Sequence, residues 1–214
     1  MQTIAHGTHY LIVNCSEPSD PQFRGVQEAS DLLGRLPRAL KLTWKGNTIA
    51  LRRRRGLRWI LISGHGAEES ARLSDGGNNA LAPGDLSLPD DCVLYLLGCY
   101  QGREILRAQW AAATGGDNTR VHGCRGETES ALSTLLLLNL LDHGPETMDQ
   151  WFSKWIDANN YLRSWFPMMR KTYREKRMDF MSALQSIKAR VDLGPVEEFV
   201  SVGTRYPELL SNLG

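Results

Sequence analysis

Two residues flanked by glycines, Cys99 and His65, have side chains that can perform nucleophilic catalysis. Cys99 stands in the segment "LLGCYQG", and His65 stands in the segment "SGHG". A thiolate is a strong nucleophile, and an imidazole beside it can accept the thiol proton. The pair therefore predicts a dyad in which Cys99 is the nucleophile and His65 is the general acid and base.

The glycines around these residues favour the same chemistry. Gly66 leaves room for a substrate carbonyl to approach the backbone, so the N–H groups of Gly66 and Cys99 predict an oxyanion hole. Gly98 allows a sharp turn at a strand end, and the amino end of a helix starting near Gly102 favours a thiolate. We expect no cofactor for this reaction and no metal, because the scattered histidines and cysteines lack the ligand spacing of a zinc site.

The elements that must position these residues can be read from the apolar pattern. Buried strands are predicted at 10–14, 57–66, 92–99 and 119–126, and helices are predicted at 25–36, 102–115 and 129–141. Short apolar strands separated by helices predict a three-layer α/β domain whose sheet is mainly parallel and flanked by helices. In such sheets functional groups gather beyond the carboxyl ends of the strands, where His65 and Cys99 both stand.

Outside this core the pattern is less regular. The alternation over 40–53 predicts a β-hairpin or a strand with a bent extension. We divide the chain into a core at 1–142 and a mainly helical C-terminal part at 143–214, which would pack on the same domain. Within that part, the segment 196–209 predicts one last strand.

A strand ending in His-Gly, followed by a strand ending in Gly-Cys-x-x-Gly, resembles the caspase-fold cysteine peptidases of clan CD. The motif "LLGCYQG" is most similar to the CHAT and separase branch, and the resemblance covers roughly residues 8–142. It implies a caspase-like fold and an endopeptidase that cleaves proteins through an acyl-enzyme. It also implies activation by a regulatory protein or ligand, and a place in bacterial defence.

The resemblance also bears on substrate choice, since caspases hold Asp with arginines and their relatives hold Arg or Lys with carboxylates. The segment "RGETE" after the fourth strand supplies Glu127 and Glu129, although separase-like proteins have a different acidic segment there. We therefore expect a basic residue at the P1 position of the substrate. Weaker candidates for the pocket are Asp91, Asp20, Asp90 and Asp75.

Two alternatives remain open from the sequence. Cys99 could be a small packing residue, and the fold could be an inactive scaffold that binds a protein or nucleic acid through basic segments such as "LRRRRGLR". With 25 Lys and Arg against 24 Asp and Glu, the overall charge predicts neither membrane nor direct nucleic-acid binding. The four cysteines have no CxxC spacing and no signal peptide is recognisable, so we expect a cytoplasmic protein.

Overall fold

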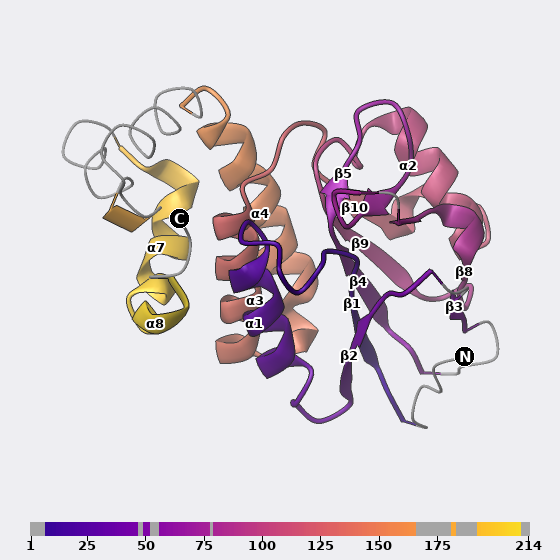
Figure 1. Ribbon diagram of the computed structural model, residues 1–214, viewed down its shortest axis with the longest axis horizontal. Helices are drawn as coiled ribbons and strands as arrows, with labels where there is room; N and C mark the ends of the chain where they lie inside the picture. Colours follow the sequence, from indigo (N-terminus) through magenta and orange to yellow (C-terminus); the bar gives the residue numbers. More distant parts are fainter. Residues whose placement is uncertain are drawn as a thin grey trace. The chain divides into compact units, whose positions relative to one another are not determined.

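The computed structural model describes residues 7–46, 49–51, 56–77, 79–165, 181–182 and 192–210 (Figure 1). The chain forms two compact units. The first combines Met1–Glu17 with Ser30–Thr128, and the second combines Pro18–Ala29 with Glu129–Gly214. This division differs from the expected boundary at residue 142, because the third predicted helix groups with the C-terminal helices. Each unit is described by itself.

The first unit is built on a five-stranded parallel sheet, whose strands lie side by side in Figure 1 in the order β10-β9-β4-β1-β2. Nearly continuous apolar runs form the central strands, as expected for a sheet that is buried on both faces. Leu11, Ile60 and Leu94 are fully buried. The strands are β1 (Tyr10–Asn14), β2 (Ala39–Thr43), β4 (Trp59–Ser63), β9 (Val93–Leu97) and β10 (Val121–Gly123).

The register of the central strands places their carboxyl ends level with one another. Ser63, the last residue of β4, pairs with Asn14 at the end of β1 and with Leu97 at the end of β9. Residues that follow β4 and β9 therefore emerge at one edge of the sheet.

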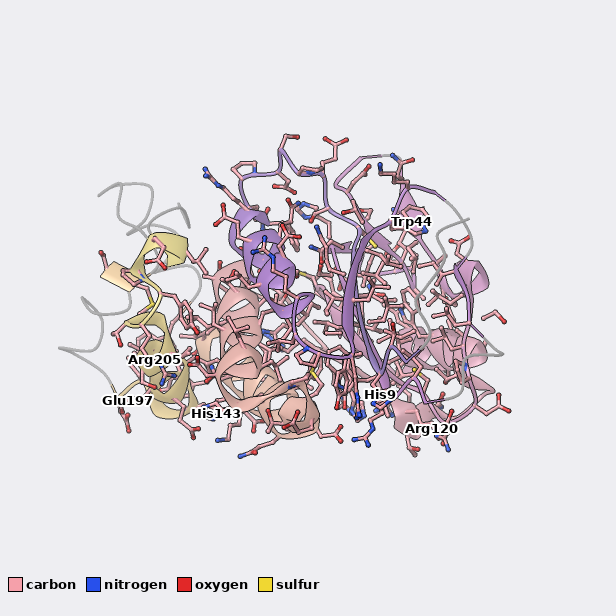
Figure 2. The ribbon with its side chains drawn as sticks, turned by 90° about the horizontal axis from the view of Figure 1, so that it is seen from below. His9, Trp44, Arg120, His143, Glu197 and Arg205 are labelled. Carbon is pink, nitrogen blue, oxygen red and sulfur yellow. The ribbon has the colours of Figure 1, made fainter. Side chains whose placement is uncertain are left out.

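The edge where the strands begin carries basic residues. His9 directly precedes β1 and Arg120 directly precedes β10; both are labelled in Figure 2. Burial lowers the pKa of His9, and the charges of Arg38 and Arg58 lower it further.

The helix predicted after Cys99 is confirmed. Helix α2 (Glu104–Ala111) continues into the 3₁₀ turn η2 (Ala112–Thr114) and packs against β10. Its Trp110 is fully buried and belongs to the apolar core of the first unit, together with side chains of β1, β4 and β9. Helix α2 therefore anchors the C-terminal end of the loop after Cys99 to the core.

Short strands fill the loops between the long ones. Strands β5 (His65–Gly66), β6 (Leu73–Ser74) and β7 (Ala80–Leu81) form a small antiparallel sheet. Strand β3 (Ile49–Ala50) pairs in parallel with β8 (Leu86–Ser87). The 3₁₀ turns here are η1 (Pro83–Asp85) and η3 (Asn118–Arg120).

The hairpin expected within 40–53 is wrong. β2 pairs with β1 in the main sheet, whereas β3 pairs with β8 in a separate ribbon. The alternation that suggested a hairpin has another cause: Leu40 and Leu42 pack on the core from β2, and Ile49 packs on it from β3. Residues 52–55 of the basic segment lie outside the described residues.

The second unit is helical where it is described. Helix α3 (Ser130–His143) is buried from Ala131 to Leu140, as its apolar sequence predicts, and packs against α4 (Met148–Leu162) and α7 (Glu197–Gly203). The remaining elements are the turns η4 (Pro145–Thr147) and η5 (Gly194–Val196), and helix α8 (Pro207–Leu210). Glu197 and Arg205 in Figure 2 mark the start of α7 and the residues after it.

The strand expected at 196–209 is wrong, because this segment forms α7 and α8. Val196, Phe199 and Val202 are fully buried and recur every three residues, which is a helical spacing. The ring of Phe199 meets Trp151 of α4 at 5.8 Å between centroids, edge to face. Residues 166–180 lie outside the described part of the chain.

One helix spans the division between the units. Helix α1 (Arg24–Leu33) begins one residue before the predicted range 25–36 and ends before Gly34. Val26, Ala29 and Leu33 are buried, as expected for an amphipathic helix. The predicted α/β class, with a mainly parallel sheet, helices and a helical C-terminal part, is confirmed. No helix in the described ranges is both long and apolar enough to cross a lipid bilayer.

Candidate active site

Cys99 and His65, the two residues of the predicted dyad, stand at one edge of the sheet. Each lies two residues beyond a strand end, and those strand ends, Ser63 and Leu97, are directly paired. Both residues are half-buried. The juxtaposition expected from a parallel sheet therefore occurs within the first unit alone.

The segments 64–66 and 98–99, which follow β4 and β9 and are called the His65 tip and the Cys99 tip, contact each other through backbone atoms. A Cβ added to Gly66 would lie 2.1 Å from the carbonyl oxygen and 2.7 Å from the backbone nitrogen of Cys99. A Cβ added to Gly98 would lie 2.9 Å from the carbonyl oxygen of Gly64 and 2.1 Å from Leu73. Since no side chain fits at either position, glycine is required there for the two tips to meet.

This contact brings the predicted oxyanion-hole residues, Gly66 and Cys99, together. Donors that stabilise an oxyanion must be fixed before the reaction, within hydrogen-bond reach of one oxygen position. In this structure the backbone segments that carry the two predicted donors are in close contact.

The sulfur of Cys99 is held by Thr128, which follows β10. The Thr128 backbone N–H donates a hydrogen bond to Sγ at 3.3 Å, and the Thr128 hydroxyl lies 3.6 Å from Sγ. The backbone and hydroxyl of Thr128 therefore fix the position of the Cys99 sulfur. Sequence reasoning missed Thr128, although it stands between the two predicted glutamates.

The loop that carries Thr128 is bound to the loop that carries Cys99. Gly102 N–H donates to the Cys124 carbonyl at 2.8 Å, and Tyr100 N–H donates to the Gly126 carbonyl at 2.8 Å. A Cβ added to Gly102 would lie 1.9 Å from the carbonyl oxygen of Gly123. The second glycine of the cysteine motif is thus explained by this close approach.

His65 begins β5 and is positioned by β6. Ser74, its antiparallel partner, donates from its hydroxyl to the His65 carbonyl at 3.4 Å. The imidazole lies beside Gly76, whose φ of +88° favours glycine and where an added Cβ would come within 3.3 Å of Nε2.

Tyr100, directly after Cys99, connects the site to Glu127. Its φ of +66° is unusual for a residue with a Cβ, and its hydroxyl donates to Glu127 Oε1 at 3.3 Å. Burial raises the pKa of Tyr100, and the charge of Glu127 raises it further. The guanidinium of Arg103 lies 4.8 Å from the centre of the Tyr100 ring and pairs with Glu68 at 2.7 Å. Of the predicted pocket residues, Glu127 is therefore brought next to the cysteine loop.

Asp91, another predicted pocket residue, lies at the opposite edge of the sheet. It precedes β9; burial raises the pKa of the neighbouring Cys92, and the charge of Asp91 raises it further. The five residues of β9, at about 3.3 Å each, separate this edge from Cys99 by roughly 16 Å. The structure thus does not bring Asp91 to Cys99, because strand β9 runs between them.

Asp20 and Glu129 belong to the second unit. Asp20 accepts a hydrogen bond from the N–H of Gln22 at 2.9 Å and so closes its own turn. Glu129 precedes α3, and its N–H donates to the side chain of Asn159 at 2.8 Å. Neither residue is assembled with Cys99 inside the first unit.

The weaker candidates Asp75 and Asp90 lie in different places relative to the predicted dyad. Asp75 lies in the turn beside Ser74 and Gly76, near His65; hydrogen bonds, first from Gly77 N–H and then from Asn79, lower its pKa. Asp90 lies near Gly115, whose added Cβ would come within 3.2 Å of an Asp90 carboxylate oxygen. Of these two residues, Asp75 is the one that lies close to the predicted dyad.

The four cysteines, all within the described residues, form no disulfide. Cys15, Cys92 and Cys124 are buried, in agreement with a packing role. Among the described residues, no group of histidines, cysteines and carboxylates is arranged to hold a metal ion.

Comparison with known proteins gives no relative: no family model matches the chain, and no curated protein or solved structure matches it. The functional argument therefore depends on the geometry of the site.

Proposed function

We propose that the protein is a cysteine endopeptidase of the caspase-fold type. Cys99 Sγ attacks the scissile carbonyl carbon and His65 takes the thiol proton. The oxyanion is stabilised by the N–H groups of Gly66 and Cys99. His65 then protonates the leaving amine, and a water molecule hydrolyses the thioester to free the carboxyl product and the thiol.

The observation that carries this proposal is the backbone contact between Gly66 and Cys99, where an added Cβ would meet the Cys99 carbonyl oxygen at 2.1 Å. A packing cysteine at a strand end has no need of a glycine tip pressed against its backbone. Further support comes from Thr128, whose N–H donates to Sγ at 3.3 Å. The half-exposed state of both His65 and Cys99 leaves them accessible to a substrate.

For substrate choice we propose a basic P1 residue held by Glu127. Glu127 precedes Thr128, the residue that contacts Sγ, and accepts a hydrogen bond from Tyr100, the residue after Cys99. A carboxylate at that place complements the charge of an arginine or lysine side chain.

The setting of the reaction is also proposed. The resemblance to CHAT peptidases supports activation by a partner protein or ligand and a place in bacterial defence, and the dyad needs no cofactor. Four cysteines without a disulfide agree with a reducing, cytoplasmic compartment.

The test is cleavage of a fluorogenic peptide library that varies the P1 residue. Wild type is compared with Cys99→Ala and His65→Ala, with Cys92→Ala as the control that removes a buried thiol far from the site. The proposal requires activity in wild type and in Cys92→Ala, and its loss in both dyad variants. Activity that survives in Cys99→Ala refutes it. A wild type that neither cleaves nor reacts selectively at Cys99 favours the scaffold that binds a partner.

A further inference from the structure

We propose that Gln101 is a positioning residue that fixes the spacing between the His65 tip and the Cys99 tip. This inference rests on the proposed peptidase function and adds a third element to its machinery. Gln101 stands two residues after Cys99 and is fully buried, which is unusual for a glutamine.

The side-chain amide of Gln101 joins three parts of the first unit. The two N–H groups of its Nε2 face three carbonyls, those of Ala67 at 3.1 Å, Cys99 at 3.1 Å and Ser70 at 3.4 Å, so one N–H is shared between two of them. Its Oε1 accepts from Nε1 of Trp110 in α2 at 2.8 Å. Indole nitrogen only donates, so Trp110 fixes which end of the amide faces the loops.

The hydrogen bonds of Gln101 are made beside Gly66 and Cys99, the two residues whose N–H groups would form the oxyanion hole. Ala67 directly follows Gly66, and the Cys99 carbonyl is the group that closes against Gly66. The peptide group between Cys99 and Tyr100 is held on both sides, since its carbonyl binds Gln101 and its N–H binds Gly126. This double attachment explains how Tyr100 keeps its positive φ.

An apolar side chain of the same size at position 101 would fill the volume of Gln101 but would not fix the distance between the His65 tip and the Cys99 tip. It would leave the Trp110 N–H and the loop carbonyls without the amide, and the two tips could then move apart. Loss of one fixed oxyanion donor lowers kcat by about 10²-fold to 10³-fold, so we expect a loss near the lower value, about 10²-fold, with KM changed less than about threefold.

The first experiment compares Gln101→Met with Gln109→Met, the same substitution at an exposed position on α2. Hydrogen exchange is followed in segments 64–71 and 98–103, together with the iodoacetamide rate at Cys99, which needs the thiolate but no oxyanion hole. We expect faster exchange in both segments and an unchanged alkylation rate for Gln101→Met, and no change for Gln109→Met. Unchanged exchange in Gln101→Met overturns the proposal, whether or not the protein cleaves peptides.

The second experiment uses Gln101→Glu and separates positioning from packing. A protonated glutamate can accept from Trp110 and donate to one carbonyl, whereas the carboxylate cannot donate. Burial raises the pKa of such a carboxyl, so the ratio of variant to wild-type kcat should rise as the pH falls through that pKa. A ratio that does not change with pH, or a parallel loss of kcat, alkylation and thermal stability in both Gln101 variants, overturns the positioning role.

If wild type neither cleaves a peptide in the library nor reacts selectively at Cys99, the peptidase proposal fails. The exchange experiment still decides whether Gln101 holds the two tips together, so the two failures are distinguishable.

Discussion

The backbones of Gly66 and Cys99 are in direct contact, although 34 positions of sequence separate His65 from Cys99. The register of β4 with β9 produces this contact, because it brings the two strand ends level. The main chain therefore brings the two tips into contact, and the buried side-chain amide of Gln101 links them further.

Replacing Gly66 by alanine should disturb this contact. The new methyl would lie 2.1 Å from the Cys99 carbonyl oxygen, so the backbone must shift, and we expect about 1–3 kcal/mol lower free energy of unfolding in urea. Gly84→Ala is the control, because nothing lies within 4 Å of an added Cβ there. Equal stability of the two variants would mean that the tips are not in contact in solution.

Iodoacetamide should modify Cys99 well before the other cysteines. Cys99 is half-exposed, whereas Cys15, Cys92 and Cys124 are buried. Burial raises the pKa of Cys15, aided by the charge of Asp75, and raises that of Cys92 to about 12, aided by Asp91. Only the thiolate reacts, so near neutral pH we expect at least about a tenfold faster reaction at Cys99.

Peptide mass mapping after limited reaction measures this order. In concentrated urea all four cysteines should react alike, which serves as the control for reagent and digestion. A buried cysteine that reacts as fast as Cys99 in the native protein would contradict the assigned environments.

The main sheet was predictable because its strands are nearly continuous apolar runs bounded by glycine or polar residues. The apolar pattern failed where the secondary structure or the strand pairing depends on which distant segment packs against it. β2 and β3 look like the arms of one hairpin, yet each pairs with a strand distant in sequence. At 196–209 the valines suggested a strand, whereas burial at every third residue favours α7.

The placement of His65 and Cys99 at one edge of the sheet was predictable because glycines mark both residues as strand tips. Thr128 and Gln101 were not, since their roles depend on contacts that arise only after the loops fold together. A signal for Gln101 did exist: a long amide in a glycine-bounded loop that follows an apolar strand must find partners if it is buried. Asp91 and Asp20 could not be rejected from the sequence, which does not give their distances from Cys99.

Tyr100 should titrate above the ordinary tyrosine value of 10.0, because burial and the Glu127 charge raise its pKa. A raised pKa in the folded state means that Tyr100 contributes stability below the unfolded value, and that this contribution is lost as pH rises through the folded value. Its phenolate absorbance is obtained as the difference between wild type and Tyr100→Phe, which removes the signal of the other tyrosines.

Glu127→Gln should lower the pKa of Tyr100 part of the way toward 10.0, since burial remains the larger cause. Glu146→Gln is the matched control in the second unit and should leave the titration unchanged. A Tyr100 midpoint that does not move in Glu127→Gln would show that the hydroxyl and the carboxylate are apart in solution.

Glu127→Gln should also change substrate choice. Its side chain keeps its size but loses the charge that would pair with a basic P1 residue, and a hydrogen bond to a charged group contributes about 1.5–3 kcal/mol. We expect kcat/KM to fall about 10-fold to 100-fold for peptides with P1 arginine and to change little for peptides with an uncharged P1 residue. Asp91→Asn, at the opposite edge of the sheet, should alter neither value. If Glu129→Gln lowers the arginine preference while Glu127→Gln does not, the pocket belongs to the residue that precedes α3, and Glu127 serves only to hold Tyr100.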